Sequence, residues 1–534
     1  MANFLYFQVQ PNGNNQEAID FEVVGFEGHE AISQSYEFKF DLRSELPFKN
    51  VNFLGKRAVF TIQMDSVGDY NTEIQQSKYH GLIFDFTMCG KIKDYYYYKA
   101  TLAPKIDKLK YSTKSDVYIE AGLPEILNTV FNEHGLSAQD QKLAFNIYDK
   151  KYQSNEGIYN RYGYVCQYEE SDLNFINRLL ERDGVYYYFN QINPDCEQMI
   201  VTDRKEEFLV REKKLSFRFT SDQSSAPDPN AISYIELRSK LVPKQVTIMN
   251  FGYEKANLGD NGVISSTANV SINGSEDSSL FGEVFIYGEN FINPDNQEDG
   301  KFLASIRAQE IYSMSRVYTA KSTVVPINAG MKIKIEDQDD STFNGDYMVI
   351  EIFHRGQQQL AGMQNLSDNP IFYENTLTLI PAQVQFRPQR RTPWPKIEGT
   401  MNALIDGETG NSYPFIDSTG RYKVRLPFLK EAKPDAKGSI WLRMATPFAG
   451  DSYGFNFPLY KGTEVVLSFR NGNPDLPVIM SAVFNSAHKN VIVDSNSYIG
   501  GAIITNAGNI FAMNDRKNAT SIGLYANDTW HEYK

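Results

Sequence analysis

The sequence predicts a mainly β protein that contains a few short helices. Aromatic residues make up 13% of the 534 residues, and aromatic rings fit the pleated, half-buried surface of a sheet. Polar and apolar residues alternate with period two at residues 21–26 and 36–42, so every second side chain can face a core. One core rarely serves more than roughly 250–300 residues, so a chain of this length allows about three or four folding units.

Further strands are expected in the first part of the chain. The candidates are residues 58–64, 81–87 and 95–102, and the last of these begins with four consecutive tyrosines that can serve both faces of a sheet. We expect this region to form a sheet or a barrel.

Two short helices interrupt these strands, and each carries its own start and stop signals. In the first, Pro124 suits the first helical turn and Gly135 suits a left-handed C-cap. In the second, Ser171 can cap the N-terminus and Gly184 can end the helix, just before an expected strand at 185–189. A third helix near residues 301–315 has a weaker apolar stripe.

Prolines mark a boundary near residue 390. Three of them lie between residues 388 and 395, and each fixes φ and removes an amide donor, which opposes strand pairing. We expect a linker at 389–395 after an N-terminal region at 1–388.

Beyond the linker the sequence predicts strands and turns. Residues 396–488 contain several short strands, as expected of a small barrel of the OB type. These strands are expected at residues 421–426, 440–445, 464–469 and 477–484. The tail at 489–534 has very short strands separated by Asn, Gly and Asp, which is too little chain for a core of its own. The tail therefore needs partner chains.

Charge and cysteine content exclude several classes of protein. The net charge is −13 and 41% of the residues are hydrophobic, which excludes a disordered chain and a basic nucleic-acid coat. The three cysteines, Cys89, Cys166 and Cys196, are far apart and have no CxxC spacing, so a disulfide scaffold and a zinc site are not expected. The start of the sequence lacks a cationic segment and no apolar stretch is long enough to span a membrane, so we expect synthesis and folding in the cytoplasm.

We expect no catalytic residue, no cofactor-binding residue and no metal ligand. The six histidines lie singly, and His134 precedes the Gly135 cap, where the helix dipole stabilises a cation. Residues 450–454 match the GxSxG nucleophile pattern around Ser452, but an alternating segment broken by a proline follows instead of a helix. The carboxylate pairs at 169–170 and 339–340 are adjacent in sequence, so their side chains should diverge.

Nucleic-acid binding is not expected either. Within residues 396–488 the ten Lys and Arg exceed the nine Asp and Glu by one, which is too little for an electrostatic groove. The only local candidate is Arg421 to Arg425, and its alternation favours a strand with one charged, solvated face.

Several segments resemble, in order, one known family. They are residues 30–38, 166–189, 344–347, 417–424, 441–443, 447–450, 457–458, 462–466 and 472–479. They are similar to the VgrG family, the trimeric hub-and-spike proteins of type VI secretion and related contractile injection systems, which are similar to the hub and spike of contractile phage tails. The match covers nearly the whole chain.

The resemblance implies a homotrimer. Two related barrel-like units per hub would present a pseudo-sixfold base to a hexameric, Hcp-like tube protein, the OB barrels would form a neck, and the tails would wind into a triangular β-prism. Other implied partners are baseplate components, a PAAR-like tip protein and effectors. The target membrane would be punctured rather than stably bound, and the protein would be made and assembled in the cytoplasm and delivered out of the cell on contraction.

The sequence departs from longer family members at its end. It stops at Lys534, soon after the expected prism begins, so we expect neither a long needle nor a toxin domain, and we expect effectors to be separate proteins. A type VI system and an extracellular injection particle both remain open. Two other functions were weighed: a cell-wall hydrolase or esterase that uses Ser452, and an oligonucleotide-binding module centred on Arg421 to Arg425.

Overall fold

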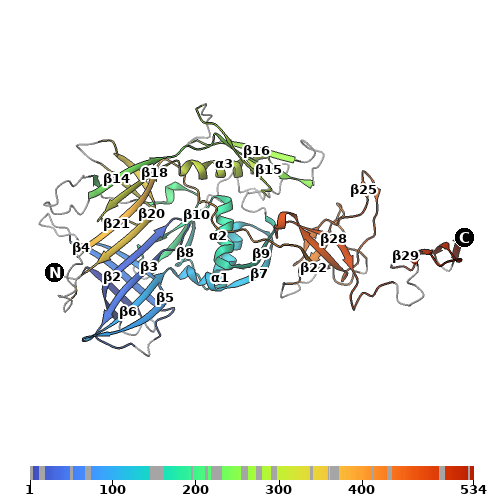
Figure 1. Cartoon of the computed structure of the whole chain (residues 1–534), viewed down its shortest axis with the longest axis horizontal. Helices are drawn as coiled ribbons and strands as arrows, with labels where there is room; N and C mark the ends of the chain where they lie inside the picture. The colour runs from blue at the N-terminus through green and yellow to red at the C-terminus, as the bar shows by residue number, and fades with distance from the viewer. Residues whose placement is uncertain are drawn as a thin grey trace. The chain divides into compact units, whose positions relative to one another are not determined.

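The structure is a computed structural model that divides into two compact units, unit 1 (residues 1–395) and unit 2 (residues 396–534). Each unit is described by itself (Figure 1). The described residues are 4–10, 18–48, 52–65, 74–144, 162–193, 196–210, 214–217, 231–253, 263–271, 279–289, 297–336, 341–358, 360, 372–411, 413–429, 436–491, 500–526 and 529–533.

A closed ring of antiparallel strands, the first ring, opens unit 1. Its strands pair in the order β1-β4-β5-β6-β3-β2, and β2 pairs back onto β1. They are β1 (Leu5–Gln10), β2 (Ile19–Ala31), β3 (Glu37–Ser44), β4 (Arg57–Asp65), β5 (Ile74–Ile92) and β6 (Tyr95–Ala103). Every second side chain points inward, as the period-two pattern predicts, and Phe38, Phe40 and Phe60 contact one another in the interior.

A second ring is fused to the first. Its strands pair in the order β20-β21-β18-β14-β13, and Leu215, just before β13, bridges to Ile335 at the end of β19, which pairs with β20. They are β12 (Leu209–Val210), β13 (Ser216–Phe217), β14 (Ala231–Ser239), β18 (Arg316–Ser322), β19 (Met331–Ile335), β20 (Gly345–Gln357) and β21 (Phe372–Pro381). The pairing of residues 25–31 of β2 with residues 351–357 of β20 joins the two rings into one sheet.

Short helices and small sheets pack around the rings. They are the 3-10 helices η2 (Lys105–Tyr111) and η5 (Lys205–Glu207), α1 (Leu123–Glu133), α2 (Asp172–Asp183), α3 (Gln297–Ser313), the pair β7 (Thr113–Ala121) and β9 (Tyr162–Ser171), the sheet of β8 (Gln141–Ala144), β10 (Tyr186–Asn190) and β11 (Gln198–Thr202), and the sheet of β15 (Gln245–Phe251), β16 (Val263–Asn269) and β17 (Glu283–Tyr287). The Oγ of Ser171 accepts from the Asn174 amide at 3.2 Å, and Gly184 has φ 71°, so both predicted caps of α2 are confirmed.

Unit 2 begins with a five-stranded barrel. The sheet order is β24-β23-β22-β27-β28, and a bridge between Met444 and Ile479 closes it. The elements are β22 (Thr400–Ile405), β23 (Tyr422–Arg425), β24 (Ile440–Leu442), β25 (Ala449–Gly450), β26 (Tyr453–Gly454), β27 (Glu464–Phe469), the 3-10 helix η8 (Arg470–Gly472) and β28 (Pro477–Val483).

The last element is a four-stranded meander, the tail sheet. It consists of β29 (Gly500–Ile504), β30 (Ile510–Asn514), β31 (Ser521–Ala526) and β32 (Thr529–Tyr533). The predicted fold class, mainly β with a few short helices, is confirmed, and α3 differs from its expected bounds only by starting and ending a few residues earlier. Within the ranges given above, no helix is long and apolar enough to cross a membrane.

Candidate functional site

The tail sheet carries apolar side chains on both of its faces. Because side chains alternate along a strand and the register pairs Ile503 with Phe511 and Phe511 with Leu524, these three residues share one face. The register places Ile504, Ile510 and Tyr525 together on the opposite face. Residues 500–526 contain no buried apolar side chain, and Ile503 and Leu524 are 43% and 48% exposed. A sheet of this kind needs a covering surface on each face.

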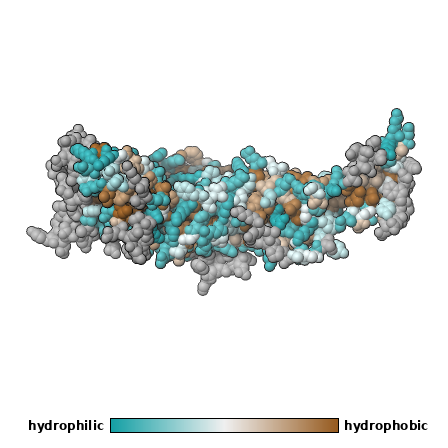
Figure 2. All heavy atoms as spheres, turned by 90° about the horizontal axis from the view of Figure 1, so that it is seen from below, coloured by the Kyte–Doolittle hydropathy of each residue, from teal (hydrophilic) through white to brown (hydrophobic). Residues whose placement is uncertain are grey.

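A second apolar surface lies on the hairpin of β25 and β26. Four aromatic side chains there are each more than half exposed, at 52–61%: Phe448, Tyr453, Phe455 and Phe457. The Phe448 ring contacts those of Tyr453 and Phe455, and the Phe455 ring contacts that of Phe457. Figure 2 shows hydrophobic residues reaching the surface in separate patches among hydrophilic ones. Contiguous exposed aromatic rings are typical of protein–protein contact surfaces.

Ser452 lies at the tip of this hairpin. Ala449 pairs with Gly454 and Gly450 pairs with Tyr453, so residues 451 and 452 form a two-residue turn in which Ser452 has φ 66°. Its hydroxyl donates to the Asp451 carboxylate at 3.2 Å. A nucleophile elbow instead joins a buried strand to a helix and pairs the serine with a base. The geometry of the GxSxG segment is therefore that of a surface turn.

The three cations of the Arg421–Arg425 segment have different environments. Arg421 donates to the Asp417 carboxylate at 2.7 Å, and Lys423 donates to the Ser439 carbonyl at 2.9 Å while lying over the Trp441 ring. Among the described residues, Arg425 has no ion-pair partner. A continuous basic strand for a phosphate backbone is therefore not formed.

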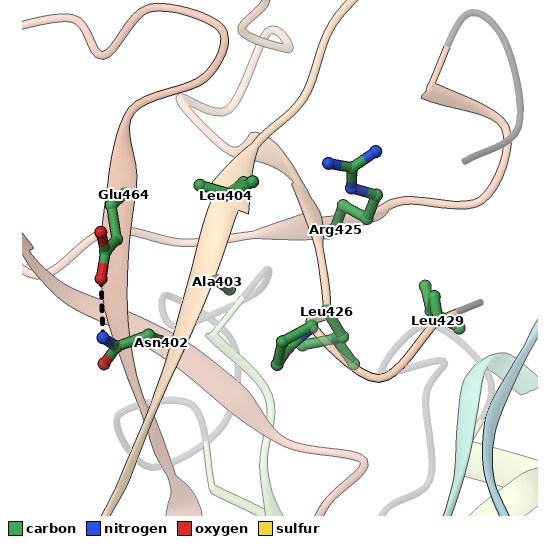
Figure 3. Close-up of a pocket in the computed structure, with 8 residues that line it drawn as sticks. Asn402, Ala403, Leu404, Arg425, Leu426, Leu429 and Glu464 are labelled. Carbon is green, nitrogen blue, oxygen red and sulfur yellow. Dashed lines mark hydrogen bonds between the residues drawn. The ribbon is translucent and has the colours of Figure 1, made fainter. Parts of the chain in front are cut away.

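Arg425 lines a pocket of about 480 Å³ on the barrel, drawn in Figure 3. The other lining residues are Asn402, Ala403, Leu404, Leu426, Pro427, Leu429 and Glu464. In Figure 3, Leu404 and Arg425 lie above Leu426 and Leu429, and a hydrogen bond joins Asn402 to Glu464 at one side. The pocket thus combines apolar side chains with one cation, Arg425, and one carboxylate, Glu464.

In unit 1 the carboxylate pair at 169–170 diverges, as the sequence predicts. Glu170 is buried and accepts from Arg178 through both of its oxygens, at 2.7 and 3.0 Å. Glu169 is exposed, and its amide donates to Ser115. The pair therefore holds the fold rather than catalysing proton transfer. The second pair, 339–340, lies outside the described residues.

Two histidines contact buried carboxylates. The Nε2 of His134, the C-cap of α1, lies 2.7 Å from Asp172. Burial alone would raise the pKa of Asp172, but hydrogen bonds from Gln167 and His134 and the nearby Lys114 hold it below its ordinary value. The contacts of His134 and Gln167 with Asp172 lie at the start of α2 and fix its position.

At the junction of the two rings, His354 contacts the Glu30 carboxylate at 2.8 Å and the Tyr373 hydroxyl at 2.9 Å. Tyr79 donates to the same carboxylate at 3.0 Å. All four side chains are buried, so a substrate in solution does not reach them. In the part of the chain that the structure describes, no group of three His, Cys, Asp or Glu residues is placed to hold a metal ion.

The proline-rich segment is attached to unit 1 by contacts that the sequence does not reveal. We call residues 387–394 the anchor segment. The Glu181 carboxylate accepts from the amides of Arg391 and Thr392, each at 3.0 Å, and from the Thr392 hydroxyl at 2.8 Å. The Trp394 ring lies 4.2 Å from the Arg178 guanidinium. No pattern in the sequence around Glu181 or around residues 387–394 indicates these contacts.

An ion pair and a further hydrogen bond also hold the anchor segment. Arg390 donates to the Glu289 carboxylate, and Arg387 donates to Gln309 of α3 at 2.8 Å. Arg307, buried beside them, donates to the Glu181 carbonyl at 2.6 Å, and burial together with Arg390 lowers the pKa of Arg307 to about 10. The expected linker is therefore fixed to α2 and α3 up to residue 394.

Two protein-family models match this chain. The family model described as phage tail baseplate hub (GPD) matches residues 29–360, more than half of the chain. The chain belongs to the phage tail baseplate hub family. A second model, the type VI secretion system/phage-baseplate injector OB domain, matches residues 416–484 of this hub protein, within the five-stranded barrel.

Curated relatives of this baseplate hub protein include spike proteins. It is 24% identical to the type VI secretion system spike protein VgrG4b of Pseudomonas aeruginosa, over 99% of this chain and 63% of that protein. It is 25% identical to the spike protein VgrG3 of Vibrio cholerae, over 91% of this chain and 45% of that protein. The chain thus spans less than two thirds of the length of these relatives. The VgrG-family membership that the motifs predict is confirmed.

Solved structures share the fold of this baseplate hub protein. A type VI secretion component of E. coli, described as similar to the T4 bacteriophage tail proteins gp27 and gp5, matches with a TM-score of 0.59 at 20% identity, over 89% of this chain and 99% of that chain. A chain of a structure described as a PdpA–VgrG complex matches with a TM-score of 0.64 at 12% identity, over 98% of this chain and 94% of that chain.

Proposed function

We propose that this chain is a structural hub-and-spike protein at the tip of a contractile injection machine of the type VI secretion kind. It acts without catalysis as a homotrimer. The observation that carries the proposal is the tail sheet, whose two apolar faces are not covered by any of the described residues. Three copies, the number that the VgrG resemblance implies, would cover these faces and build the triangular prism.

The two fused rings support a junction with a hexameric tube. Each copy contributes two rings, of six and seven strands, that share one 13-stranded sheet, so three copies supply six rings around one axis. That number matches a hexameric, Hcp-like tube protein. Baseplate components, a PAAR-like tip protein and separate effector proteins are the other proposed partners.

The anchor segment supports a mechanical role. Thrust applied to unit 1 would pass to the following chain through residues 387–394, which hydrogen bonds fix to α2 and α3 and an ion pair fixes to Glu289. Such contacts keep the exit point of the chain rigid under load. Contraction would then carry the spike from the cytoplasm, where it is assembled, out of the cell and through a target membrane.

Analytical ultracentrifugation of the full chain tests the proposal. We expect the wild type to sediment as a trimer and Leu524→Asp to sediment as a monomer, because a charge on an interface face is costly to bury. Thr520→Asp is the matched control, since it adds the same charge at an exposed turn and should remain trimeric. A wild-type chain that stays monomeric while the tail sheet is folded would overturn the assignment.

The other functions that were weighed gain no support from the geometry. A hydrolase or esterase needs an activated nucleophile, whereas Ser452 forms a hairpin turn. An oligonucleotide site needs several accessible cations, whereas Arg421 and Lys423 are engaged within the barrel.

A further inference from the structure

The sheet of the unit 2 barrel has an open edge beside the pocket of Figure 3. β22 pairs with β27 along residues 400–404, but on its other side only Leu404 and Ile405 pair with β23. β23 ends at Arg425 and the chain turns away at Leu426. Among the described residues, the first part of β22 therefore has a strand on one side only.

The backbone of Asn402 faces this opening. The Ile405 amide donates toward β27, to Thr463 at 2.9 Å, and the Asp406 amide donates toward β23, to Lys423 at 2.8 Å. Because backbone groups alternate in direction along a strand, Leu404 and Asn402 point their N–H and C=O groups to the β23 side. The N–H and C=O of Asn402 are thus placed to pair with an added strand.

The wall of the pocket is aliphatic. Leu404, Leu426 and Leu429 line it together with Ala403, and no aromatic ring belongs to the described lining. A volume of about 480 Å³ holds a few side chains. Bases bind single-strand sites mainly by stacking on aromatic rings, so this lining favours a polypeptide over a nucleic acid.

Arg425 supplies the charge that selects the ligand. Arg425 lies opposite Leu404, and Leu404 lies opposite Glu464, so two strand spacings, about 10 Å, separate the Cα atoms of Arg425 and Glu464. The two Glu464 oxygens accept from the side-chain amides of Asn402 and Asn485, at 2.6 and 2.7 Å. Since Arg425 has no ion-pair partner among the described residues, it is available to a carboxylate from outside.

We propose that this pocket docks an extended segment of a partner protein that carries an acidic side chain next to apolar ones. The segment adds as a strand beside Asn402, an apolar side chain enters the pocket between Leu404 and Leu426, and the carboxylate pairs with Arg425. Main-chain hydrogen bonds supply affinity and the two side-chain contacts supply specificity. No residue of the tail sheet belongs to the described lining of this pocket.

Fluorescence anisotropy with the full chain tests the proposal. The probe is a labelled heptapeptide, Thr-Val-Thr-Asp-Thr-Val-Thr, whose Asp and Val side chains share one face of a strand. The comparison ligands are the same peptide with Lys in place of Asp and a ten-nucleotide oligothymidylate. We expect the Asp peptide to bind, with affinity about tenfold or more lower in Arg425→Gln, because a charge-assisted hydrogen bond is lost. Arg425→Lys should retain part of the affinity.

Lys437→Gln is the matched control, because it removes an exposed cation from the same barrel and should bind the Asp peptide as the wild type does. An unchanged thermal unfolding profile of Arg425→Gln would show that the barrel is folded. Absence of binding by the wild type, equal affinity in Arg425→Gln, or an Arg425-dependent preference for the oligonucleotide would each overturn the proposal. Because trimer formation is measured separately, failure here leaves the proposed spike function intact.

Discussion

Unit 1 and the tail sheet place their apolar side chains in opposite ways. In unit 1 the alternating residues of a closed ring point inward, so Phe38 and Phe60 are fully covered by their own chain. In the tail sheet the same alternation leaves Ile503 and Leu524 about half exposed. Alternation therefore sets which side chains share a face, but closure of the sheet decides whether that face is covered. We therefore expect unit 1 to fold as a single chain and the tail sheet to need a covering partner.

The largest effect is expected from Glu170→Ala in unit 1. Arg178 would remain buried without its bidentate partner, which costs about 3–5 kcal/mol of unfolding free energy. Urea unfolding of unit 1 should show this loss equally at every protein concentration. The unfolding free energy of the tail sheet should instead decrease when the protein is diluted. Glu169→Ala, at the exposed neighbouring position, should have little effect. If unfolding of unit 1 also depended on concentration, the contrast between the two regions would be wrong.

A smaller effect is expected from Glu181→Ala at the end of unit 1. This change removes the acceptor of three hydrogen bonds from the anchor segment and should cost about 1–3 kcal/mol. The amides of Arg391 and Thr392 should then exchange hydrogen faster, while the amides of the first ring keep their rates. Glu125→Ala, at an exposed position of α1, is the control. Unchanged exchange at both amides would show that the anchor segment is held by other contacts.

Acid should weaken unit 1 through Asp172. Its pKa lies below the unfolded value of about 3.9, so its contribution is complete above that pH and is lost as the pH falls through the folded pKa. The unfolding free energy of Asp172→Asn should therefore depend less on pH below about 4 than that of the wild type. Asp94→Asn, at an exposed turn, should keep the wild-type dependence. Identical pH profiles for Asp172→Asn and the wild type would refute this assignment.

The smallest effect is expected from Ser452→Ala at the hairpin tip. The hydroxyl is exposed and bonds only its neighbour among the described contacts, so stability should change by about 0.5 kcal/mol or less. Any hydrolysis of a p-nitrophenyl ester or of peptidoglycan should be the same in variant and wild type. Wild-type hydrolysis that disappears in a folded Ser452→Ala would replace the structural function with an enzymatic one.

Local signals predict local structure well in this chain. Ser171 and Gly184 define α2 from a few neighbouring residues, and the structure confirms both caps. The tail also lacks a core of its own, as its composition predicts, because short strands cannot cover two faces. The residues after the GxSxG segment around Ser452 likewise sufficed to predict that it is not a nucleophile elbow, because no helix pattern follows it.

Contacts between distant residues could not be predicted. Glu181 and Thr392 are 211 residues apart, and nothing near either residue indicates the other. Likewise Arg421, Lys423 and Arg425 look equivalent in the sequence, yet Asp417 and Ser439 engage two of them and the third lines a pocket. Which cation is available is decided by packing of the barrel, and alternation alone does not reveal it.

The shared strand pair of the two rings has a consequence for synthesis. The junction between the rings can form only after residues 351–357 of β20 have been synthesised, long after residues 25–31 of β2. At about 5–20 residues per second, the ribosome needs on the order of tens of seconds to make that stretch. During this time the edge of β2 is exposed beside a nascent chain. Control of translation speed, or a chaperone that covers this edge, should therefore determine how much of the newly made protein reaches the native state.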